Sequence, residues 1–130
     1  MDIFETFDKK LKTFMDITEN DLFLQNCALG KVKEYIKNTA NIKEIPEGLD
    51  YVVIDRAIGE FLAFKKGTGT LEVTNIDLDA VFSSIQEGDT RVDLGYGKGT
   101  QTPEQRLDDL INYLITYGEK EILGYRRLRW

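Results

Sequence analysis

Several residue types that carry chemistry in proteins are absent or rare in this chain of 130 residues. It has no histidine, so the side chain that most often serves as an acid, a base or a metal ligand near neutral pH is missing. Cys27 is the single cysteine, which excludes an internal disulfide and a zinc site built from thiolates. The only serines, Ser83 and Ser84, do not stand in a nucleophile-elbow pattern. We therefore expect a protein that is not an enzyme and needs no cofactor or metal.

Positive charge and long apolar runs are also scarce. The formal net charge is -6 and the sequence pI is about 4.7, whereas a general nucleic-acid binder needs a surplus of lysine and arginine. The most apolar stretch, Tyr51–Phe64, is interrupted by Asp55, Arg56 and Glu60, so it is not expected to span a membrane. Residues Met1–Glu5 do not resemble a signal peptide. A soluble protein of a reducing compartment, with no membrane partner, is expected.

What the chain does have is enough apolar surface for one folded domain. Hydrophobic residues make up 42% of the sequence and only 2 residues are proline, which favours a single domain over residues 1–130. Apolar residues recur at helical spacing in four stretches. These are Ile3, Phe7, Leu11 and Phe14; Leu24, Ala28, Val32, Tyr35 and Ile36; Leu49, Val53, Ala57, Phe61 and Phe64; and Leu107, Leu110, Ile111, Leu114 and Ile115. The pattern predicts an all-α fold, a small bundle of about four helices.

Start and stop signals agree with these helices. Thr18 with Asp21 resembles a helix start, and Pro46 suits the first turn of the third helix. Thr102–Gln105 is the clearest start, because threonine can cap, proline fits the first position and glutamine can bond back. The third helix is apolar around most of its circumference, so we expect it at the centre of the bundle. Residues 38–45 are predicted to be a polar connection.

A long segment before the last main helix, here called the insert (residues 67–101), differs from the rest. It holds six of the 11 glycines, and the stretch Glu72–Leu94 carries six carboxylates against one arginine, a net charge of −5. Asp77–Ser84 is compatible with a short helix and Thr90–Leu94 with a strand of a short β-hairpin. Loops of this length inside small domains are usually functional or disordered. The insert is therefore a candidate for function.

Three features of the sequence suggest chemistry but have simpler explanations. Gly95–Thr100 resembles a phosphate-binding loop, yet Gly99 separates Lys98 from the threonine and the glycine spacing is wrong. Nucleotide binding there remains an alternative to a plain connection. The paired carboxylates are explained by solvation and by the dipole at the start of the last helix; they are Asp77/Asp79, Asp108/Asp109 and Glu119/Glu121. Cys27 is interpreted as a small buried core residue.

The C-terminal segment, here called the tail (residues 124–130), combines aromatic rings with a charge of +3. Tryptophan, tyrosine and arginine are enriched at the hot spots of interfaces. One interpretation packs Trp130 onto its own core, and the other makes the tail a docking element for acidic surface. We favour docking; the insert of a neighbouring copy would offer such a surface, in a heterologous contact that closes into a ring. The predicted interface residues are Tyr125, Arg126, Arg127, Leu128, Arg129 and Trp130.

Three stretches of the sequence resemble the phage head–tail connector (adaptor) proteins, of the type found in prophages of low-GC Gram-positive bacteria. Pro46–Ala57 (PEGLDYVVIDRA) is similar to the central helix of that family. Ser83–Thr90 (SSIQEGDT), followed by the glycine-rich run and the capped last helix, is similar as well, and Tyr125–Trp130 (YRRLRW) resembles the family's C-terminal ending. The resemblance covers residues 18–130 and is weakest for Met1–Asp16.

This resemblance implies a small helical bundle that assembles as a ring beneath the portal, at the vertex through which DNA enters the capsid. Such a ring extends the DNA channel and offers a docking surface to the next head-completion or tail protein. The expected partners are the portal protein, that next protein and further copies of the chain, while DNA passes through without specific binding. The resemblance makes Val81–Gly99 the loop that faces neighbours or the channel, and the tail the part that engages the portal. The implied location is the host cytoplasm before assembly and the head–tail junction of the virion afterwards.

An acidic channel wall agrees with this role, because a tube through which DNA slides should not hold phosphates. The charged residues of the insert are expected to line the channel or to contact the next subunit; they are Asp77, Asp79, Glu87, Asp89, Arg91 and Asp93. The alternative function, from a different class, is a small cytoplasmic binding or regulatory module that takes a nucleotide at Gly95–Thr100.

Overall fold

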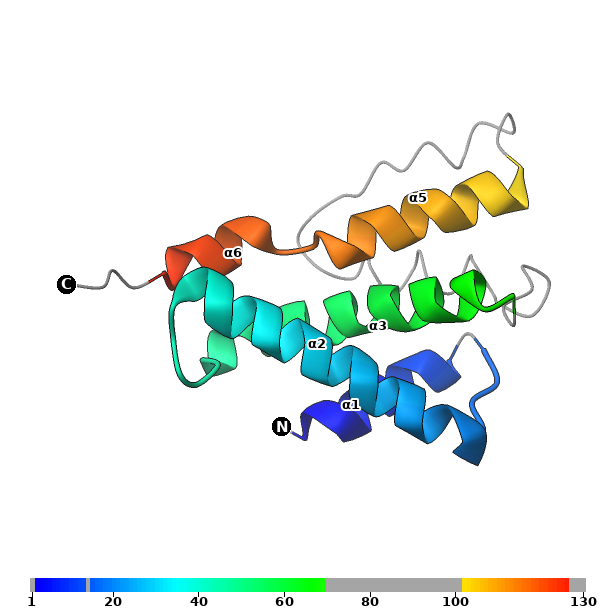
Figure 1. Ribbon diagram of the computed structural model, residues 1–130, viewed down its shortest axis with the longest axis horizontal. Helices are drawn as coiled ribbons and strands as arrows, with labels where there is room; N and C mark the ends of the chain where they lie inside the picture. The colour runs from blue at the N-terminus through cyan, green and yellow to red at the C-terminus, as the bar shows by residue number, and fades with distance from the viewer. Residues whose placement is uncertain (1, 14, 70–101, 127–130) are drawn as a thin grey trace.

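A computed structural model describes residues 2–13, 15–69 and 102–126, which form helices joined by short connections (Figure 1). No β-strand lies among these residues. The helices are α1 (Ile3–Lys12), α2 (Leu22–Ala40), α3 (Asp50–Gly67), α5 (Pro103–Ile115) and the short α6 (Glu119–Gly124); the 3-10 turns η1 (Glu19–Asp21) and η2 (Glu47–Leu49) precede α2 and α3. The predicted all-α bundle is confirmed. The short helix and the β-hairpin considered for the insert fall on residues 70–101, outside the described residues.

The starts of α2 and α5 follow the signals in the sequence, whereas Pro46 lies in extended backbone ahead of η2 and not in the first turn of α3, which begins at Asp50. At the start of α5, the Gln105 backbone N–H donates to Thr102 Oγ1 (3.2 Å) and the Thr102 backbone N–H donates to Gln105 Oε1 (3.0 Å). This reciprocal pair satisfies two amides that have no partner within the helix. Ahead of α2, the Thr18 backbone N–H donates to Asp21 Oδ2 (3.0 Å). The α2 helix continues to Ala40, so the predicted connection at residues 38–45 begins three residues too early.

Helix α3 occupies the centre of the bundle, as its apolar circumference predicts. Helices α1 and α2 pack on it from one side and α5 from the other (Figure 1). Ten of its 18 residues are buried, including the predicted core positions Val53, Ala57 and Phe61. The last of these meets Phe7 of α1 edge to face, with 6.5 Å between the ring centroids. Burial of this kind stabilises a domain by about 25 cal/mol per Å² of apolar surface.

Helices α3 and α5 approach closely because a glycine stands between them. A Cβ atom at Gly59 would lie 2.7 Å from Leu114 Cβ and 2.9 Å from the Ile115 backbone nitrogen. At the end of α5 the chain turns at Gly118, whose φ of 72° lies in the left-handed region that favours glycine. A Cβ atom at Gly118 would also lie 2.6 Å from Cγ2 of Val52 in α3. These two glycines fix the course of α5 and the turn into α6.

Some residues that the spacing places in the core are on the surface. Tyr35 is 41% exposed and Phe64 is 37% exposed. Cys27 is half-buried, so the prediction of a buried core cysteine is wrong. Helical spacing identifies the apolar side of a helix, but the edge of that side is covered only where a neighbouring helix reaches it. Phe14 lies outside the described residues.

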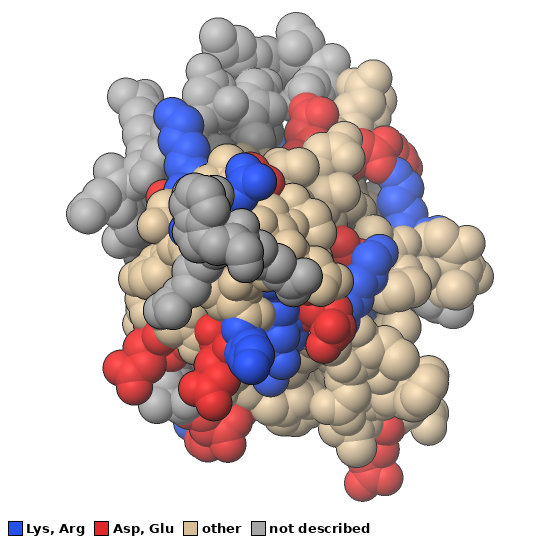
Figure 2. All heavy atoms as spheres, turned by 60° about the vertical axis from the view of Figure 1, so that its left-hand side comes forward, with Lys and Arg blue, Asp and Glu red and all other residues tan. Residues whose placement is uncertain are grey.

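The insert and the tail leave the bundle at opposite ends of its long axis. The end of α3 and the beginning of α5, which flank the insert, lie at the same end in Figure 1, on the right. Helix α6, which leads to Arg126 and the tail, lies at the other end, on the left. On the face turned forward in Figure 2, acidic and basic side chains are interspersed between uncharged areas.

Candidate functional site

A buried arginine ties the helices of the bundle together. Arg56 stands in the middle of α3 and is 5% exposed. Its Nε donates to the Tyr117 carbonyl oxygen (2.6 Å), its Nη1 to the Ile115 carbonyl oxygen (3.0 Å) and its Nη2 to Glu119 Oε2 (2.5 Å). The Ile115 carbonyl is at the end of α5, where helix carbonyls have no amide partner, and the Tyr117 carbonyl lies in the turn that follows. The arginine therefore caps α5 and connects it to the start of α6.

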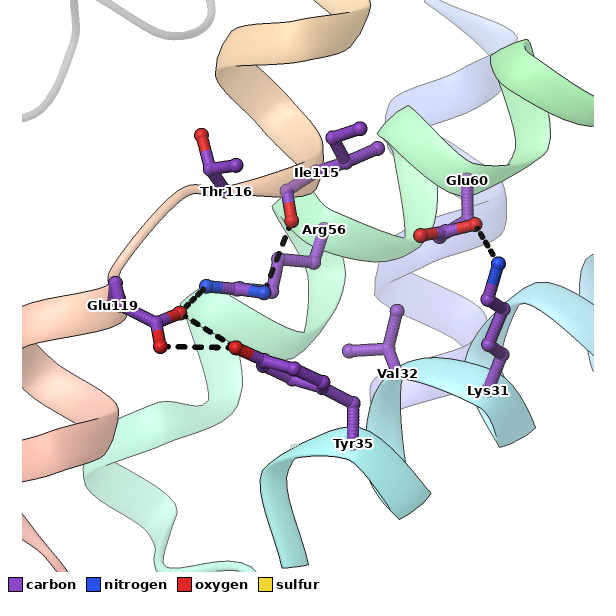
Figure 3. A pocket seen from close by; sticks show the side chains of 8 residues that line it. All are labelled: Lys31, Val32, Tyr35, Arg56, Glu60, Ile115, Thr116 and Glu119. Atoms are coloured by element: carbon purple, nitrogen blue, oxygen red, sulfur yellow. Dashed lines mark hydrogen bonds and ion pairs between the residues drawn. The ribbon is translucent and has the colours of Figure 1, made fainter. Parts of the chain in front are cut away.

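Tyr35 of α2 covers the same guanidinium group. The centre of that group lies 4.9 Å from the centroid of the tyrosine ring, which is a cation–π distance. The Tyr35 hydroxyl also lies within hydrogen-bond distance of Glu119, 2.9 Å from Oε1 and 3.0 Å from Oε2. Three elements that are distant in sequence, α2, α3 and α6, thus meet at Arg56 (Figure 3).

A hollow of about 280 Å³ opens beside this network (Figure 3). Lys31 of α2 crosses its rim to Glu60 of α3, with 3.0 Å between Nζ and Oε2. The charged groups of the hollow therefore have partners within the protein, while Val32 and Ile115 give it apolar wall. Its lining residues are Lys31, Val32, Tyr35, Arg56, Glu60, Ile115, Thr116 and Glu119. Such a site fits an uncharged group better than a free ion, because binding an ion would disturb pairs that are already formed.

A second charged pair lies one residue away on α3. Lys10 of α1 contacts Asp55, with 2.7 Å between Nζ and Oδ1, and the aspartate is 7% exposed. Burial raises the pKa of Tyr113 and of Tyr117, and the negative charges of Asp55 and Glu121 raise each pKa further. Both phenols stay protonated at neutral pH, so neither is suited to act as a base. The Lys10–Asp55 pair is explained by the packing of α1 on α3.

Of the predicted interface residues, the structure describes Tyr125 and Arg126, and both are exposed. The Tyr125 hydroxyl packs directly on Gly48 of η2, where a Cβ atom would overlap it. The tail is thus attached to the beginning of α3 at its first aromatic residue. The remaining tail residues lie outside the described residues; they are Arg127, Leu128, Arg129 and Trp130.

Most of the other residues that the sequence singles out lie outside the part of the chain that the structure describes. The candidate channel residues lie outside the described ranges; they are Asp77, Asp79, Glu87, Asp89, Arg91 and Asp93. The same holds for the Gly95–Thr100 loop. Among the paired carboxylates, Asp108 forms an ion pair with Lys66 at the end of α3, and Glu119 belongs to the Arg56 network.

The residues of the hollow were not predicted as a site, although the sequence contains a signal for them. Asp55, Arg56 and Glu60 interrupt the most apolar stretch of the chain. A charge on a helix that is apolar on nearly all sides must be buried with a partner, which marks a contact between elements. In the sequence alone, the same three charges argue only against a membrane span. The partner Glu119 and the cover Tyr35 are distant in sequence and follow only from the fold.

The fold and the hollow define an all-α bundle whose helices converge on a buried arginine. Comparison of the chain with protein-family models, with curated proteins and with solved structures finds no match. Within the described ranges, no three side chains gather as a possible metal site. No helix in that part of the chain is long and apolar enough to cross a membrane.

Proposed function

We propose that the chain is a structural head–tail connector of a phage or prophage. It assembles as a ring under the portal, extends the DNA channel, supports attachment of the tail and carries no catalysis of its own. The observation that supports this proposal best is the polarity of the bundle. The acidic insert is flanked by helix ends at one end of the long axis, and the basic tail begins after α6 at the other (Figure 1).

This polarity favours head-to-tail contacts between copies. Two different surfaces of one molecule, with opposite charge, make a heterologous contact, and such contacts close into a ring when the rotation between copies allows it. The stretch Glu72–Leu94 carries −5 and the tail +3, so the segments of neighbouring copies attract. On the face shown in Figure 2, the acidic and basic side chains of the bundle are mixed.

The tail is also suited to a second partner, the portal protein. Tyr125 attaches the start of the tail to Gly48, and Arg126, which follows it, is exposed. Arginine and tryptophan carry a large share of binding energy in interfaces. In this proposal the insert contacts the next subunit and its carboxylates line the channel, where they keep DNA from binding.

The test uses charge reversal in the tail and the portal protein encoded in the same genome. Arg127→Glu combined with Arg129→Glu should abolish co-elution with the portal in size-exclusion chromatography with light scattering. The matched control is Lys9→Glu with Lys33→Glu, which makes the same change of charge on α1 and α2 and should bind as the wild type does. Helical circular dichroism should be the same for all three proteins. Portal binding that survives the tail variant would contradict the proposed role of the tail.

The genes beside this one offer a separate check. A connector gene is expected to lie among genes for a portal and a capsid protein. A neighbourhood of unrelated metabolic or regulatory genes would count against a virion role.

A further inference from the structure

The beginning of α2 exposes a large aromatic side chain. Phe23 is 79% exposed, the largest value among the large hydrophobic residues that the structure describes. Leu22 beside it is 50% exposed. Single exposed apolar residues are common on proteins, but a nearly bare phenylalanine next to an exposed leucine is the kind of group that anchors an interface. The structure therefore raises the question of which surface covers it.

The hollow beside Arg56 has the properties of a receptor for such a ring. Its volume of about 280 Å³ is below the range of about 300–1,000 Å³ that is typical of small-molecule sites. It has apolar wall from Val32 and Ile115 and an aromatic face from Tyr35, and its charges are paired within the protein. An uncharged aromatic group gains from this wall without breaking an ion pair.

Phe23 cannot reach the hollow of its own copy. Lys31, the nearest lining residue of the hollow on the same helix, lies eight residues after Phe23, which corresponds to about 12 Å along the axis and about 80° around it. A projecting ring and a receiving hollow that are separated on one molecule and point in different directions can meet only between two copies. Such a pair gives a heterologous contact.

We propose that Phe23 of one copy inserts into the Arg56 hollow of the next copy and forms a subunit contact of the ring. This inference rests on the ring assembly proposed above and adds a specific interface to it. The charges beside the two surfaces agree with this contact. Glu19 is exposed one helical turn before Phe23. Lys31 stands at the rim of the hollow with its side chain 61% exposed, so Glu19 of the inserting copy would add a second carboxylate beside the one that Lys31 already contacts, Glu60.

The experiment compares variants of the ring and of the hollow by sedimentation velocity over a range of concentrations. Phe23→Ala removes the projecting ring, and Ile115→Asp places a charge on the wall of the hollow. Each variant alone should self-associate at least about tenfold more weakly than the wild type. Leu22→Ala is the matched control, since it removes a neighbouring exposed side chain, and it should leave self-association within about twofold of the wild type.

A mixture of the two variants separates this contact from a general loss of structure. Phe23→Ala keeps its hollow and Ile115→Asp keeps its phenylalanine, so an equimolar mixture should form heterodimers that extend no further. Phe23 is on the surface, so its replacement does not threaten folding, and rescue in the mixture shows that the second variant is folded. The inference would be overturned if Phe23→Ala self-associated as strongly as the wild type. It would also be overturned if the mixture associated no more strongly than each variant does alone.

The same variants distinguish this inference from the proposed function. Portal-bound rings that form normally with Phe23→Ala would contradict the subunit contact and leave the connector role standing. Concentration-dependent association through Phe23 without any binding to the portal would contradict the connector role and leave the contact standing.

Discussion

At the scale of single residues, Arg56 and Gly59 hold the bundle together by opposite means. Arg56 fills the junction of α2, α3, α5 and α6 with a charge that has three oxygen acceptors. Gly59, almost one turn later on α3, leaves room for α5 to approach. Both are buried in the centre of α3, where the close-packed neighbours leave a substituted side chain no room to move.

Gly59→Ala tests the close approach of α3 and α5. The added Cβ would meet Leu114 and Ile115, so we expect a loss of about 1–3 kcal/mol in the free energy of unfolding. Gly30→Ala is the matched control, because Gly30 is also inside a helix and nothing lies within 4 Å of its added Cβ. It should stabilise the protein by about 0.5–1 kcal/mol. Urea unfolding of both variants measures the difference, and equal effects would refute the close contact.

Arg56→Met tests the capping role of the buried arginine. Its removal leaves the carbonyls of Ile115 and Tyr117 without this donor, and we expect a loss of about 1–3 kcal/mol. Glu119→Gln removes only a half-exposed charge and should cost less than about 1 kcal/mol. Thermal unfolding followed by circular dichroism compares the two. A larger loss for Glu119→Gln would show that the ion pair, and not the capping, is the dominant contribution.

At the scale of the helices, ion pairs and caps decide where each element begins and what it is joined to. Asp21 illustrates this, since it accepts from the Thr18 backbone ahead of α2 and contacts Lys65 at the end of α3, with 2.7 Å between Oδ1 and Nζ. It therefore attaches the beginning of one helix to the end of another. Lys65 also lies 5.6 Å from the ring centroid of Phe61, which places the pair at the edge of the core.

The pH dependence of stability should report on Asp21. Burial alone would raise the pKa of this carboxyl, but the hydrogen bonds and charge of Lys65 and the hydrogen bonds of Thr18 outweigh it and hold the pKa below its ordinary value of 3.8. A lowered folded-state pKa means that the stabilisation is complete above the unfolded-state value and is lost as the pH falls through the folded-state value. Asp21→Asn should therefore destabilise the protein near neutral pH.

The measurement is urea unfolding of the wild type and Asp21→Asn at neutral pH and at about pH 3. The difference between the two proteins should shrink at the acidic pH. Lys65→Met removes the partner from the other side and should lower stability at neutral pH in the same direction. A difference that does not change with pH would mean that the carboxylate charge of Asp21 contributes nothing.

The sequence predicted the helices well because their signals are local. The reciprocal cap of Thr102 and Gln105 involves residues three apart, and the apolar spacing of α3 is visible without knowledge of its neighbours. The hollow could not be predicted in this way, because Tyr35 and Glu119 are brought together by tertiary packing alone. Cys27 was misplaced for the same reason, since the edge of the apolar face of α2 is not covered along its whole length.

At the scale of the whole molecule, the acidic insert and the basic tail join the bundle at opposite ends. The α3–α5 pair sets the end at which the insert leaves and returns, and α6 sets the opposite end for the tail (Figure 1). The net charge of -6 thus conceals a polarity of −5 in the stretch Glu72–Leu94 and +3 in the tail. A chain whose acidic and basic segments are attached at opposite ends of the bundle is suited to contacts with further copies and with a partner that differs from them.

The polarity leads to a salt-dependent prediction for the assembly. Contacts between the exposed charges of insert and tail weaken when salt screens them, whereas a contact made by Phe23 is apolar and weakens little. Self-association should therefore fall between 0.05 and 0.5 M salt, about the range over which screening becomes complete, and should fall less in a variant that lacks residues 127–130. Light scattering across a salt series measures this. The same salt dependence with and without the tail would exclude the tail from the contact.

The most direct test of the central claim is electron microscopy of the purified chain mixed with the portal protein encoded in the same genome. The connector proposal predicts a second ring, coaxial with the portal and continuous with its channel, and made of several copies of this 14.9 kDa chain. Portal rings without added density, with the chain remaining a separate monomer at every ratio tried, would contradict the proposal.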